Sequence, residues 1–106
     1  MYSEGVHHVK NFQFENGAVY SGICSFLIFL GQMVGIIREG EGVQIWADGA
    51  KYEGFWKKNR ANGEGIFFHA DGDIYSGTWK EDKASGYGTY THINGAKYEG
   101  QWEEDL

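Results

Sequence analysis

The sequence contains no proline and only one cysteine, Cys24. A single cysteine cannot form an internal disulfide bond, and alone it cannot make a zinc site. The apolar run from Ile23 to Leu30 has eight residues, whereas a membrane-spanning helix needs about 20. The N-terminal stretch MYSEGVHHVK lacks the charged and apolar regions of a signal peptide. We therefore expect an intracellular, cytoplasmic protein, either free or in a cytoskeletal, ciliary or membrane-peripheral structure.

Basic residues are also scarce. The chain has nine Lys and Arg against fifteen Asp and Glu, which gives a formal net charge of −6. Part of this imbalance lies in the closing acidic cluster of Glu99, Glu103, Glu104 and Asp105. Nucleic acids and anionic membranes are bound by clustered Lys and Arg. The composition therefore excludes nucleic acid as a partner and disfavours membrane lipid.

Glycine and aromatic residues, in contrast, are abundant. The chain has 17 Gly, seven Phe, seven Tyr and four Trp, and ordinary glycine usage is only about 7%. Low-complexity disorder would explain the glycine but predicts few aromatics. Glycine and aromatics without proline indicate β-sheet with many turns. Because no segment has a sustained helical period, we expect an all-β fold with no helices.

The glycines and aromatics recur with a period of 23 residues. An aromatic residue opens each repeat, and a glycine follows two residues later. The opening aromatics are Phe29, Tyr52, Tyr75 and Tyr98, and the glycines are Gly31, Gly54, Gly77 and Gly100. The next column holds Met33, Trp56, Trp79 and Trp102. A Gly-x-Gly pair then follows at Gly40 and Gly42, Gly63 and Gly65, and Gly86 and Gly88. Chance does not align this many columns over three periods.

Each repeat closes on a hairpin signal. Asp-Gly or Asn-Gly between runs of β-forming residues predicts a tight turn, because glycine supplies the positive φ that the turn needs. The pairs are Asn16-Gly17, Asp48-Gly49, Asp71-Gly72 and Asn94-Gly95. Polar stretches such as 57–62 are expected to link one hairpin to the next. The expected strands lie near 11–15, 18–23, 42–47, 50–57, 64–70, 73–80, 87–93 and 96–102.

Glycines inside strands need a reason, because glycine weakens a strand. Bare backbone would allow a neighbouring Tyr or Trp ring to lie flat on it. A two-residue loop at Asp48-Gly49 would set Tyr52 opposite Ile45. A three-residue loop with a glycine bulge would set Gly54 opposite Gly42 and Trp56 opposite Gly40. We favour the second register, because it places every motif column on one face.

Aromatic-x-Gly-x-Trp, Gly-x-Gly and Asx-Gly at a period of 23 resemble the MORN (membrane occupation and recognition nexus) repeat over residues 29–102. The resemblance implies an elongated, single-layer antiparallel sheet with one hairpin per repeat. It also implies a scaffold, partner-binding or spacer module of cytoskeletal, ciliary or membrane-junction proteins, or a regulatory part of an enzyme such as a lipid kinase. The expected organisation is one domain, 1–106, with a half-repeat at 1–22, an insertion at 23–31, repeats at 29–51, 52–74 and 75–97, and a partial repeat at 98–106.

The insertion rests on a break in the period. Tyr20-Ser-Gly22 also opens a repeat, yet the next opening follows nine residues later instead of 23. Without residues 23–31 the text reads YSGQMVGIIREGEG, a well-formed repeat. One interpretation is a local elaboration, such as a bulge or a longer strand. The other, which the alien composition favours, is a retained intron or a gene-model error. In the folded chain this segment would be an exposed, β-prone apolar run.

No catalytic or metal centre is predicted. His69 and His92 share a repeat column with Trp46, and no Cys, Asp or Glu in that column completes a metal site. Glu41 and Glu64 also share one column, which indicates a structural position before a catalytic one. Cys24 has no evident activating group. We therefore expect no enzyme activity, no metal and no cofactor.

The predicted function is docking of an extended or helical segment of a protein partner along an aromatic sheet face. The expected contact residues are Trp46, Tyr52, Trp56, Tyr75, Trp79, Tyr98 and Trp102. The expected structural glycines are Gly17, Gly49, Gly54, Gly63, Gly65, Gly72, Gly77, Gly86, Gly88, Gly95 and Gly100. Internal packing of the same rings is the competing interpretation.

Two further modes of association remain open. Lys57, Lys58 and Arg60 could hold a phosphoinositide headgroup, as in a membrane-targeting module. Each basic residue near an anionic surface contributes about 1 kcal/mol, and repulsion from the acidic end of the chain offsets this gain. The chain also ends one strand into a repeat, so we expect an open edge that invites more repeats, a partner strand or self-association.

Overall fold

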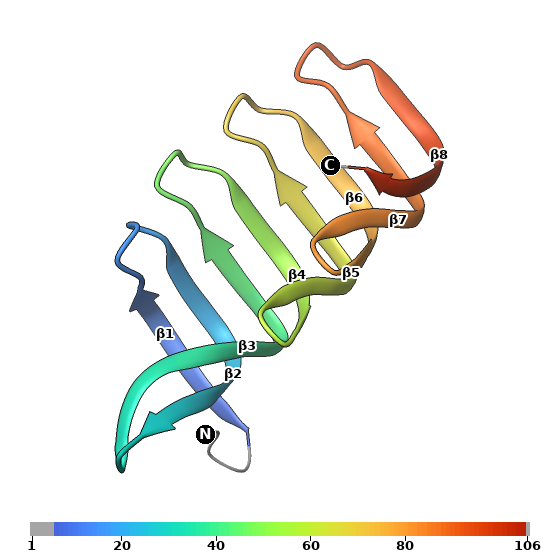
Figure 1. The fold of residues 1–106 in the computed structure, drawn as a ribbon. Coiled ribbons are helices and arrows are strands. Elements are labelled where there is room, and N and C mark those ends of the chain that lie inside the picture. The colour runs from blue at the N-terminus through green and yellow to red at the C-terminus, as the bar shows by residue number, and fades with distance from the viewer. Residues whose placement is uncertain (1–5, 106) are drawn as a thin grey trace.

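The computed structural model describes residues 6–105. These residues form one open antiparallel sheet of eight strands in sequence order, measuring 50 × 25 × 18 Å (Figure 1). The strands are β1 (His7–Gln13), β2 (Val19–Phe29), β3 (Gln32–Ile45), β4 (Lys51–Lys57), β5 (Arg60–Phe68), β6 (Ile74–Lys80), β7 (Lys83–Thr91) and β8 (Lys97–Asp105). The described residues contain no helix, and hence none that could cross a membrane. The predicted all-β sheet of successive hairpins is confirmed.

The Asx-Gly pairs form three-residue loops with a glycine bulge, as the loop between β3 and β4 illustrates. The Trp46 N–H donates to the Ala50 carbonyl at 2.9 Å, and the Gly49 N–H donates to the Trp46 carbonyl at 3.0 Å. Gly49 has a φ of 96°, which favours glycine. The Asp48 carboxylate accepts a hydrogen bond from the Ala50 N–H at 2.9 Å. Local turn chemistry therefore fixes both the loop and the register that follows from it.

That register is the one favoured from the sequence. Gly54 pairs with Gly42, and Trp56 pairs with Gly40. Ile45 pairs with Lys51, so the alternative that set it opposite Tyr52 is wrong.

The turns at the other ends of the strands, which join β4 to β5 and β6 to β7, are shorter than predicted. Lys58 and Asn59 form a two-residue turn, both with positive φ, and Glu81 and Asp82 repeat it one period later. The polar link expected over 57–62 is therefore wrong, because β5 begins at Arg60 and not near residue 64. Asn and Asp tolerate the left-handed conformation, so these turns need no glycine and carry no glycine signal.

Each two-residue turn is attached to the preceding hairpin. The Asn59 side-chain oxygen accepts a hydrogen bond from the Arg38 N–H at 2.8 Å, and the Asn59 N–H donates to the Arg38 carbonyl at 3.1 Å. Asp82 makes the same pair of bonds with Ala61, at 2.7 and 3.0 Å. These bonds tie successive hairpins together beyond the strand ladder.

A row of paired glycines crosses the sheet from β2 to β8. Its members are Gly22, Gly42, Gly54, Gly65, Gly77, Gly88 and Gly100. The pairing is irregular next to this row, between Gly54 and Trp56 and between Gly77 and Trp79. Bulges bend strands and increase their twist, and Figure 1 shows the strand ends at the two-residue turns lying across the rest of the sheet. Because of this bend, the strand ends at the two-residue turns cover one face of the same sheet.

The core lies inside this bend. Trp56 packs edge to face between Tyr20 and Tyr52, with ring centroids 5.7 and 5.1 Å apart. Its indole N–H donates to the Gly42 carbonyl at 3.2 Å, and Trp79 and Trp102 repeat this bond one and two periods later. The core also includes Cys24, Ile36, Ala61, Tyr75, Trp79 and Ala84. Aromatic rings seated on glycine backbone thus replace a second layer.

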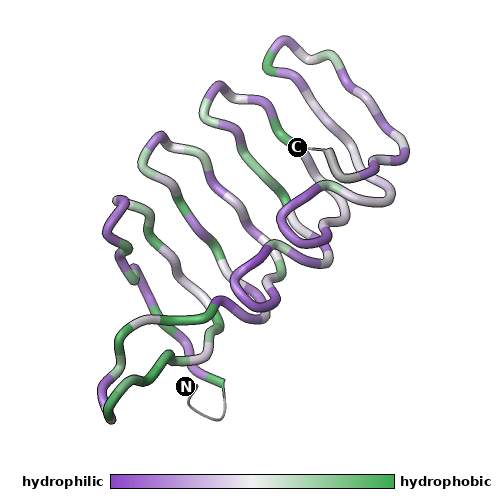
Figure 2. Tube along the Cα trace, in the orientation of Figure 1, coloured by the Kyte–Doolittle hydropathy of each residue, from purple (hydrophilic) through white to green (hydrophobic). Residues whose placement is uncertain are grey.

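The segment at 23–31 lengthens the first hairpin. It continues β2 to Phe29 and turns at Leu30 and Gly31, and β3 then runs from Gln32. In the folded chain the segment therefore forms a longer strand on each side of this turn. Figure 2 shows this projecting hairpin as the most hydrophobic stretch of the chain.

The projecting hairpin moves the first two columns of the repeat at 29–51 away from the positions that their counterparts occupy in the later repeats. Phe29 is 65% exposed and Met33 is 48% exposed, so neither occupies the column assigned to it. Tyr20, fully buried against Gly42, is the structural counterpart of Tyr52, and buried Cys24 stands at the tryptophan position. The nine extra residues shift Phe29 and Met33 out to the end of the hairpin.

Candidate functional site

The seven predicted contact residues divide by exposure. Tyr52, Trp56, Tyr75 and Trp79 are at most 4% exposed and form the core. Burial raises the pKa of the Tyr52 and Tyr75 phenols, which fits rings held away from water. Trp46 and Trp102 are half-buried, and Tyr98 is exposed on the edge strand. The second set offers most of the accessible aromatic surface, and the buried four support that surface from beneath.

The accessible part of this face is a second row of aromatics packed over the core. We call it the aromatic groove; its half-buried residues are Phe14, Trp46, Phe67, Tyr90 and Trp102. Two neighbouring pairs of rings are in contact, with centroids 5.6 Å apart for Trp46 and Phe67 and 6.0 Å apart for Tyr90 and Trp102. The sequence analysis missed Phe67 and Tyr90, although both are aromatic at one repeat position, 23 residues apart.

Two polar residues interrupt this aromatic pattern at one place. Arg38 stands where later repeats have Ala61 and Ala84, and Gln44 stands where they have Phe67 and Tyr90. The guanidinium of Arg38 donates to the Gln44 side-chain oxygen, and the Gln44 residue is only 4% exposed. Both departures from the repeat therefore meet in one contact.

The Arg38 guanidinium is held on several sides. Its Nε donates to the Asn59 side-chain oxygen at 3.1 Å, and Nη2 donates to the Asn59 carbonyl at 2.9 Å. The guanidinium carbon lies 4.5 Å from the Trp56 ring centroid and 5.5 Å from that of Phe14. Such cation–π contacts are strongest where the cation is desolvated. The sequence analysis also missed this cluster, whose signal was the simultaneous loss of two repeat residues.

The charge of Arg38 is only partly balanced. Burial lowers the pKa of its guanidinium, and the nearby Asp82 carboxylate partly opposes this shift. Among the described residues no carboxylate lies within 4.0 Å of it. A cavity of about 320 Å³ opens over the cluster. Its lining comprises Asn16, Arg38, Gln44, Trp46, Tyr52, Trp56, Asn59, Ala61, Phe67, Trp79 and Asp82.

A second polar cluster lies further along the groove. Asp73 accepts hydrogen bonds from the Tyr90 hydroxyl at 2.8 Å and from the Ile93 N–H at 2.9 Å, and His92 Nδ1 lies 3.3 Å from it. These partners lower the pKa of the Asp73 carboxyl. Burial, and then the Asp73 carboxylate, raise the pKa of Tyr90 to about 12. The cluster bridges two successive loops and holds the Tyr90 ring in place.

The two histidines of the shared column pack against neighbouring aromatic rings. His69 packs against Phe67, with centroids 4.6 Å apart, and His92 packs against Tyr90 at 4.9 Å. Within residues 6–105, no group of three or more His, Cys, Asp or Glu is arranged to hold a metal ion. Both histidines extend the aromatic row, as the sequence indicated.

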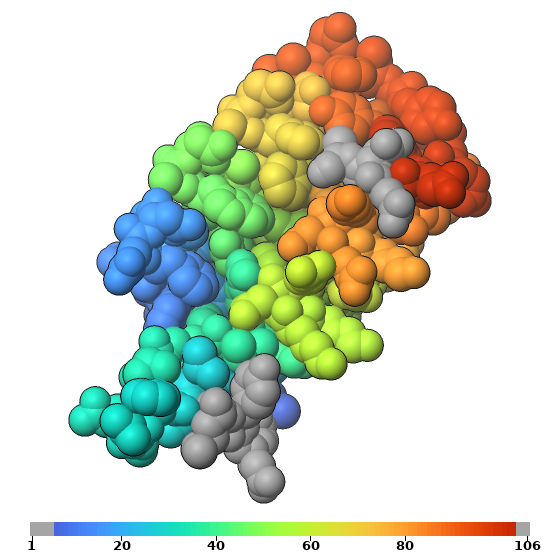
Figure 3. All heavy atoms as spheres, viewed as in Figure 1, coloured from blue at the N-terminus to red at the C-terminus, as the bar shows by residue number. Residues whose placement is uncertain are grey.

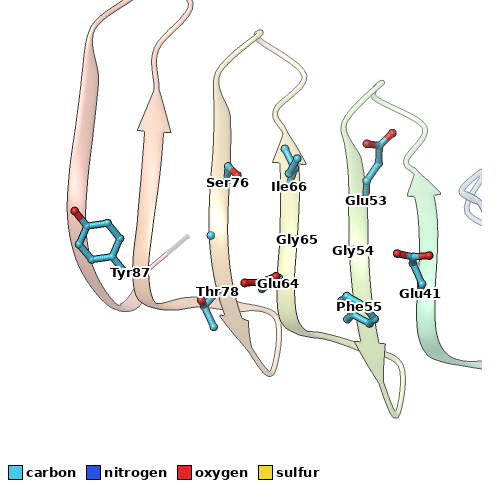
Figure 4. Close-up of a pocket in the computed structure, with 11 residues that line it drawn as sticks. Glu41, Glu53, Gly54, Phe55, Glu64, Gly65, Ile66, Ser76, Thr78 and Tyr87 are labelled. Carbon is cyan, nitrogen blue, oxygen red and sulfur yellow. The ribbon is translucent and has the colours of Figure 1, made fainter.

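The other face of the sheet carries a wider, shallower hollow of about 590 Å³ (Figure 4). Glu41, Glu53 and Glu64 come from three successive strands, and Figure 4 shows them spread around the bare backbone of Gly54 and Gly65. Their side chains do not converge on one point. The hollow exists because the glycines leave backbone uncovered, and it presents negative charge.

The basic residues of the lipid alternative lie at one two-residue turn. Lys57, Lys58 and Arg60 line a hollow of about 290 Å³ together with Asn62 and Glu81. Glu81 brings a negative charge into the same hollow, which weakens its attraction for a headgroup phosphate. The positive charge is therefore less concentrated than the sequence alone indicated.

The predicted structural glycines occupy two kinds of position. Gly17, Gly49, Gly63, Gly72, Gly86 and Gly95 have positive φ. Gly54, Gly65, Gly77, Gly88 and Gly100 lie in the glycine row, each close to a tyrosine hydroxyl.

The comparisons agree with this geometry. The family model described as MORN repeat matches residues 29–51, 52–74, 75–97 and 98–106. No curated protein shows significant similarity to the chain. The first match begins at Phe29, whereas the first structural repeat opens at Tyr20.

Proposed function

The chain belongs to the MORN repeat family, and from this premise we propose that it is a non-catalytic scaffold or adaptor. In this proposal a helical or extended segment of a partner protein lies along the aromatic groove. The family match supports a repeat module that binds protein or associates with membranes, and the groove favours the first of these. An intracellular cytoskeletal, ciliary or membrane-associated assembly fits such a module.

The observation that carries the proposal is the row of half-buried aromatics packed on the buried core. Trp46, Phe67, Tyr90 and Trp102 come from the β3–β4 loop, β5, β7 and β8, so the row runs across the strands along the sheet. Tyr and Trp contribute strongly to binding, because they offer large contact areas and few rotatable bonds. The buried tyrosines and tryptophans beneath them limit movement, so binding would require little ordering of the groove.

The cavity beside Arg38 gives the groove a polar anchor point. Its guanidinium makes three hydrogen bonds within the described residues, and an arginine side chain has five N–H groups. An acceptor on the partner, such as a carboxylate or a backbone carbonyl, could use the remaining donors. Asp82 at the rim would favour a partner that also carries a donor. The cavity thus selects a polar side chain between apolar ones.

The same observations support the absence of catalysis in this proposal. Burial raises the pKa of the Cys24 thiol, which disfavours the reactive thiolate. Glu41 and Glu64 lie on β3 and β5, which are separated by β4. Asp73 is committed to contacts with Tyr90, Ile93 and His92 within the fold. In this proposal these groups therefore have structural or binding roles.

The experiment is a selection of peptides from a displayed library on the full chain, followed by affinity measurement. Trp46→Ala should weaken the selected peptides by at least about tenfold, as expected for a tryptophan at a binding centre. Phe55→Ala is the matched control, because Phe55 is 45% exposed and lines the hollow on the other face. Equal losses for both variants, or binders that ignore Trp46, would contradict the proposal.

A further inference from the structure

The end of the long β2–β3 hairpin is the most exposed apolar feature of the described chain. Phe29, Leu30, Met33 and Val34 are 65, 86, 48 and 58% exposed, and we call these four residues the apolar tip. Residues 23–37 contain no charged side chain. Figure 3 shows the tip extending from the body of the molecule at the end that carries β1 and β2. We propose that the apolar tip inserts into the interfacial layer of a lipid bilayer.

The arrangement of the tip favours a bilayer over a protein surface. Met33 pairs with Ile28, and Phe29 is the next residue of β2, so the side chains of Met33 and Phe29 point to opposite faces of the hairpin. Both are about half exposed or more, and Leu30 and Val34 continue the apolar surface around the turn. A flat protein partner, or a second copy of the chain, would cover one face and leave the other in water. A bilayer surrounds a projecting tip on all sides.

The backbone of the hairpin limits the depth of insertion. β1 pairs with β2 only as far as Cys24, and β4 pairs with β3 only as far as Gly40. Beyond these points the outer edges of the hairpin have no neighbouring strand in the described sheet. Unpaired backbone groups are not tolerated in the hydrocarbon core. Insertion is therefore confined to the headgroup and acyl boundary, about 5–10 Å deep, which takes two or three residues of each strand.

The charge of the chain does not oppose this insertion. The first charged residue after the turn is Arg38, seven positions beyond Gly31. At roughly 3.3 Å per residue the separation is about 23 Å, and the Debye length at physiological salt is about 8 Å. Binding at the tip therefore requires neither anionic lipid nor low salt. This behaviour separates it from capture of a headgroup by Lys57, Lys58 and Arg60.

The test is flotation of the full chain with neutral phosphatidylcholine vesicles at low and at physiological salt. The chain should float with the vesicles at both salt concentrations. Leu30→Asp and, separately, Val34→Asp should reduce the bound fraction at least about tenfold. Ile93→Asp is the matched control, because Ile93 is 74% exposed at a distant loop and should keep full binding. Circular dichroism establishes that each variant is folded.

A second readout locates the inserted segment. A polarity-sensitive fluorophore on Leu30→Cys should shift to the blue when vesicles are added, whereas the same label on Ile93→Cys should not. Cys24 is 1% exposed and does not compete for the label. No flotation with neutral vesicles, a requirement for anionic lipid, or equal effects at Leu30 and Ile93 would overturn the proposal. Sedimentation showing that Leu30→Asp only dissociates an oligomer would also overturn it. None of these results affects the groove.

Discussion

The Tyr52 ring lies against the backbone of Gly65 so closely that a Cβ atom at Gly65 would collide with the tyrosine hydroxyl oxygen. The same hydroxyl donates to the Phe55 carbonyl at 3.0 Å, which holds the ring in this place. Tyr20 on Gly42 and Tyr75 on Gly88 repeat the contact. This ring-on-glycine contact is what allows a sheet without a second layer to bury a core.

Gly65→Val should therefore destabilise the chain far more than an ordinary substitution in a strand. The new side chain must displace the Tyr52 ring, and such overpacking costs about 2–3 kcal/mol, or roughly 10 °C in the thermal midpoint. Gly35→Ala is the control, because its Cβ would meet nothing closer than a Leu27 methyl carbon at 4.0 Å. Thermal unfolding followed by circular dichroism checks both variants. Equal midpoints would contradict the ring-on-glycine account.

Arg38→Ala should cost about 1–3 kcal/mol, because it leaves the buried Gln44 side chain without its hydrogen-bond donor. Arg38→Lys should not restore the loss, since an ammonium cannot reproduce the planar set of donors. The double variant Arg38→Ala with Gln44→Phe introduces the residues of the later repeats and should recover most of the stability. Urea unfolding measures all three. A double variant no better than Arg38→Ala would show that the two positions are not coupled.

The phenol of Tyr90 should lose its proton at a higher pH than an ordinary tyrosine. Its pKa is raised to about 12 in the folded chain, against about 10 in an unfolded one. Its contribution to stability is therefore complete below about pH 10 and is lost as the pH rises toward 12. Asp73→Asn should lower this pKa but leave it above the ordinary value, because burial is the larger cause. Tyrosinate absorbance is measured against pH in the full chain and in Asp73→Asn, with Tyr90→Phe to assign the signal. The pKa of Tyr90 should be highest in the full chain, lower in Asp73→Asn and still above the ordinary value there.

The Asp73 carboxyl should give the opposite dependence. Its pKa is lowered in the folded chain, first by Tyr90 and then by the Ile93 N–H. A group with a lowered pKa stabilises the fold above its unfolded pKa of about 3.9, and this stability is lost as the pH falls through the folded value. Asp73→Asn should therefore flatten the loss of stability below about pH 4. Urea midpoints measured from neutral to acidic pH test it, and an unchanged acid limb would contradict it.

Deletion of residues 23–31 should leave the rest of the fold intact. The deletion joins Gly22 to Gln32 and places Met33 at the tryptophan position that Cys24 now fills. Methionine adapts to irregular core space, so the thermal midpoint should stay within about 5 °C of the full chain, and the variant should lose the vesicle binding of the apolar tip. A variant that fails to fold would show instead that the long hairpin is required by the sheet.

Much of the fold could be predicted from the sequence, because most turns are specified by the residues within them. Asp48 and Gly49 specify their own loop, and that loop sets Gly54 opposite Gly42 without help from distant residues. The turn at Lys58 and Asn59 was missed because it has no glycine. Strand ends near it were misplaced for the same reason.

The candidate site was less predictable, because burial depends on the bend of the whole sheet. Tyr52 and Trp56 were expected at the surface as much as in the core, and only the fold of the layer at the glycine row encloses them. Phe29 satisfied its repeat column in the sequence, yet the nine extra residues carry it to the hairpin end. The roles of Arg38 and Gln44 could not be predicted, because only their contact in the structure shows that the two departures from the repeat are coupled.

The most direct test of the groove is a map of amide and indole N–H signals by nuclear magnetic resonance as a selected peptide is added. The account predicts shifts at the Trp46 and Trp102 indoles, the Arg38 Nε–H and the amides of Phe67 and Tyr90, with Phe55 and Tyr87 unaffected. Shifts centred on Glu41, Glu53 and Tyr87 instead would place binding on the other face and contradict the proposed function.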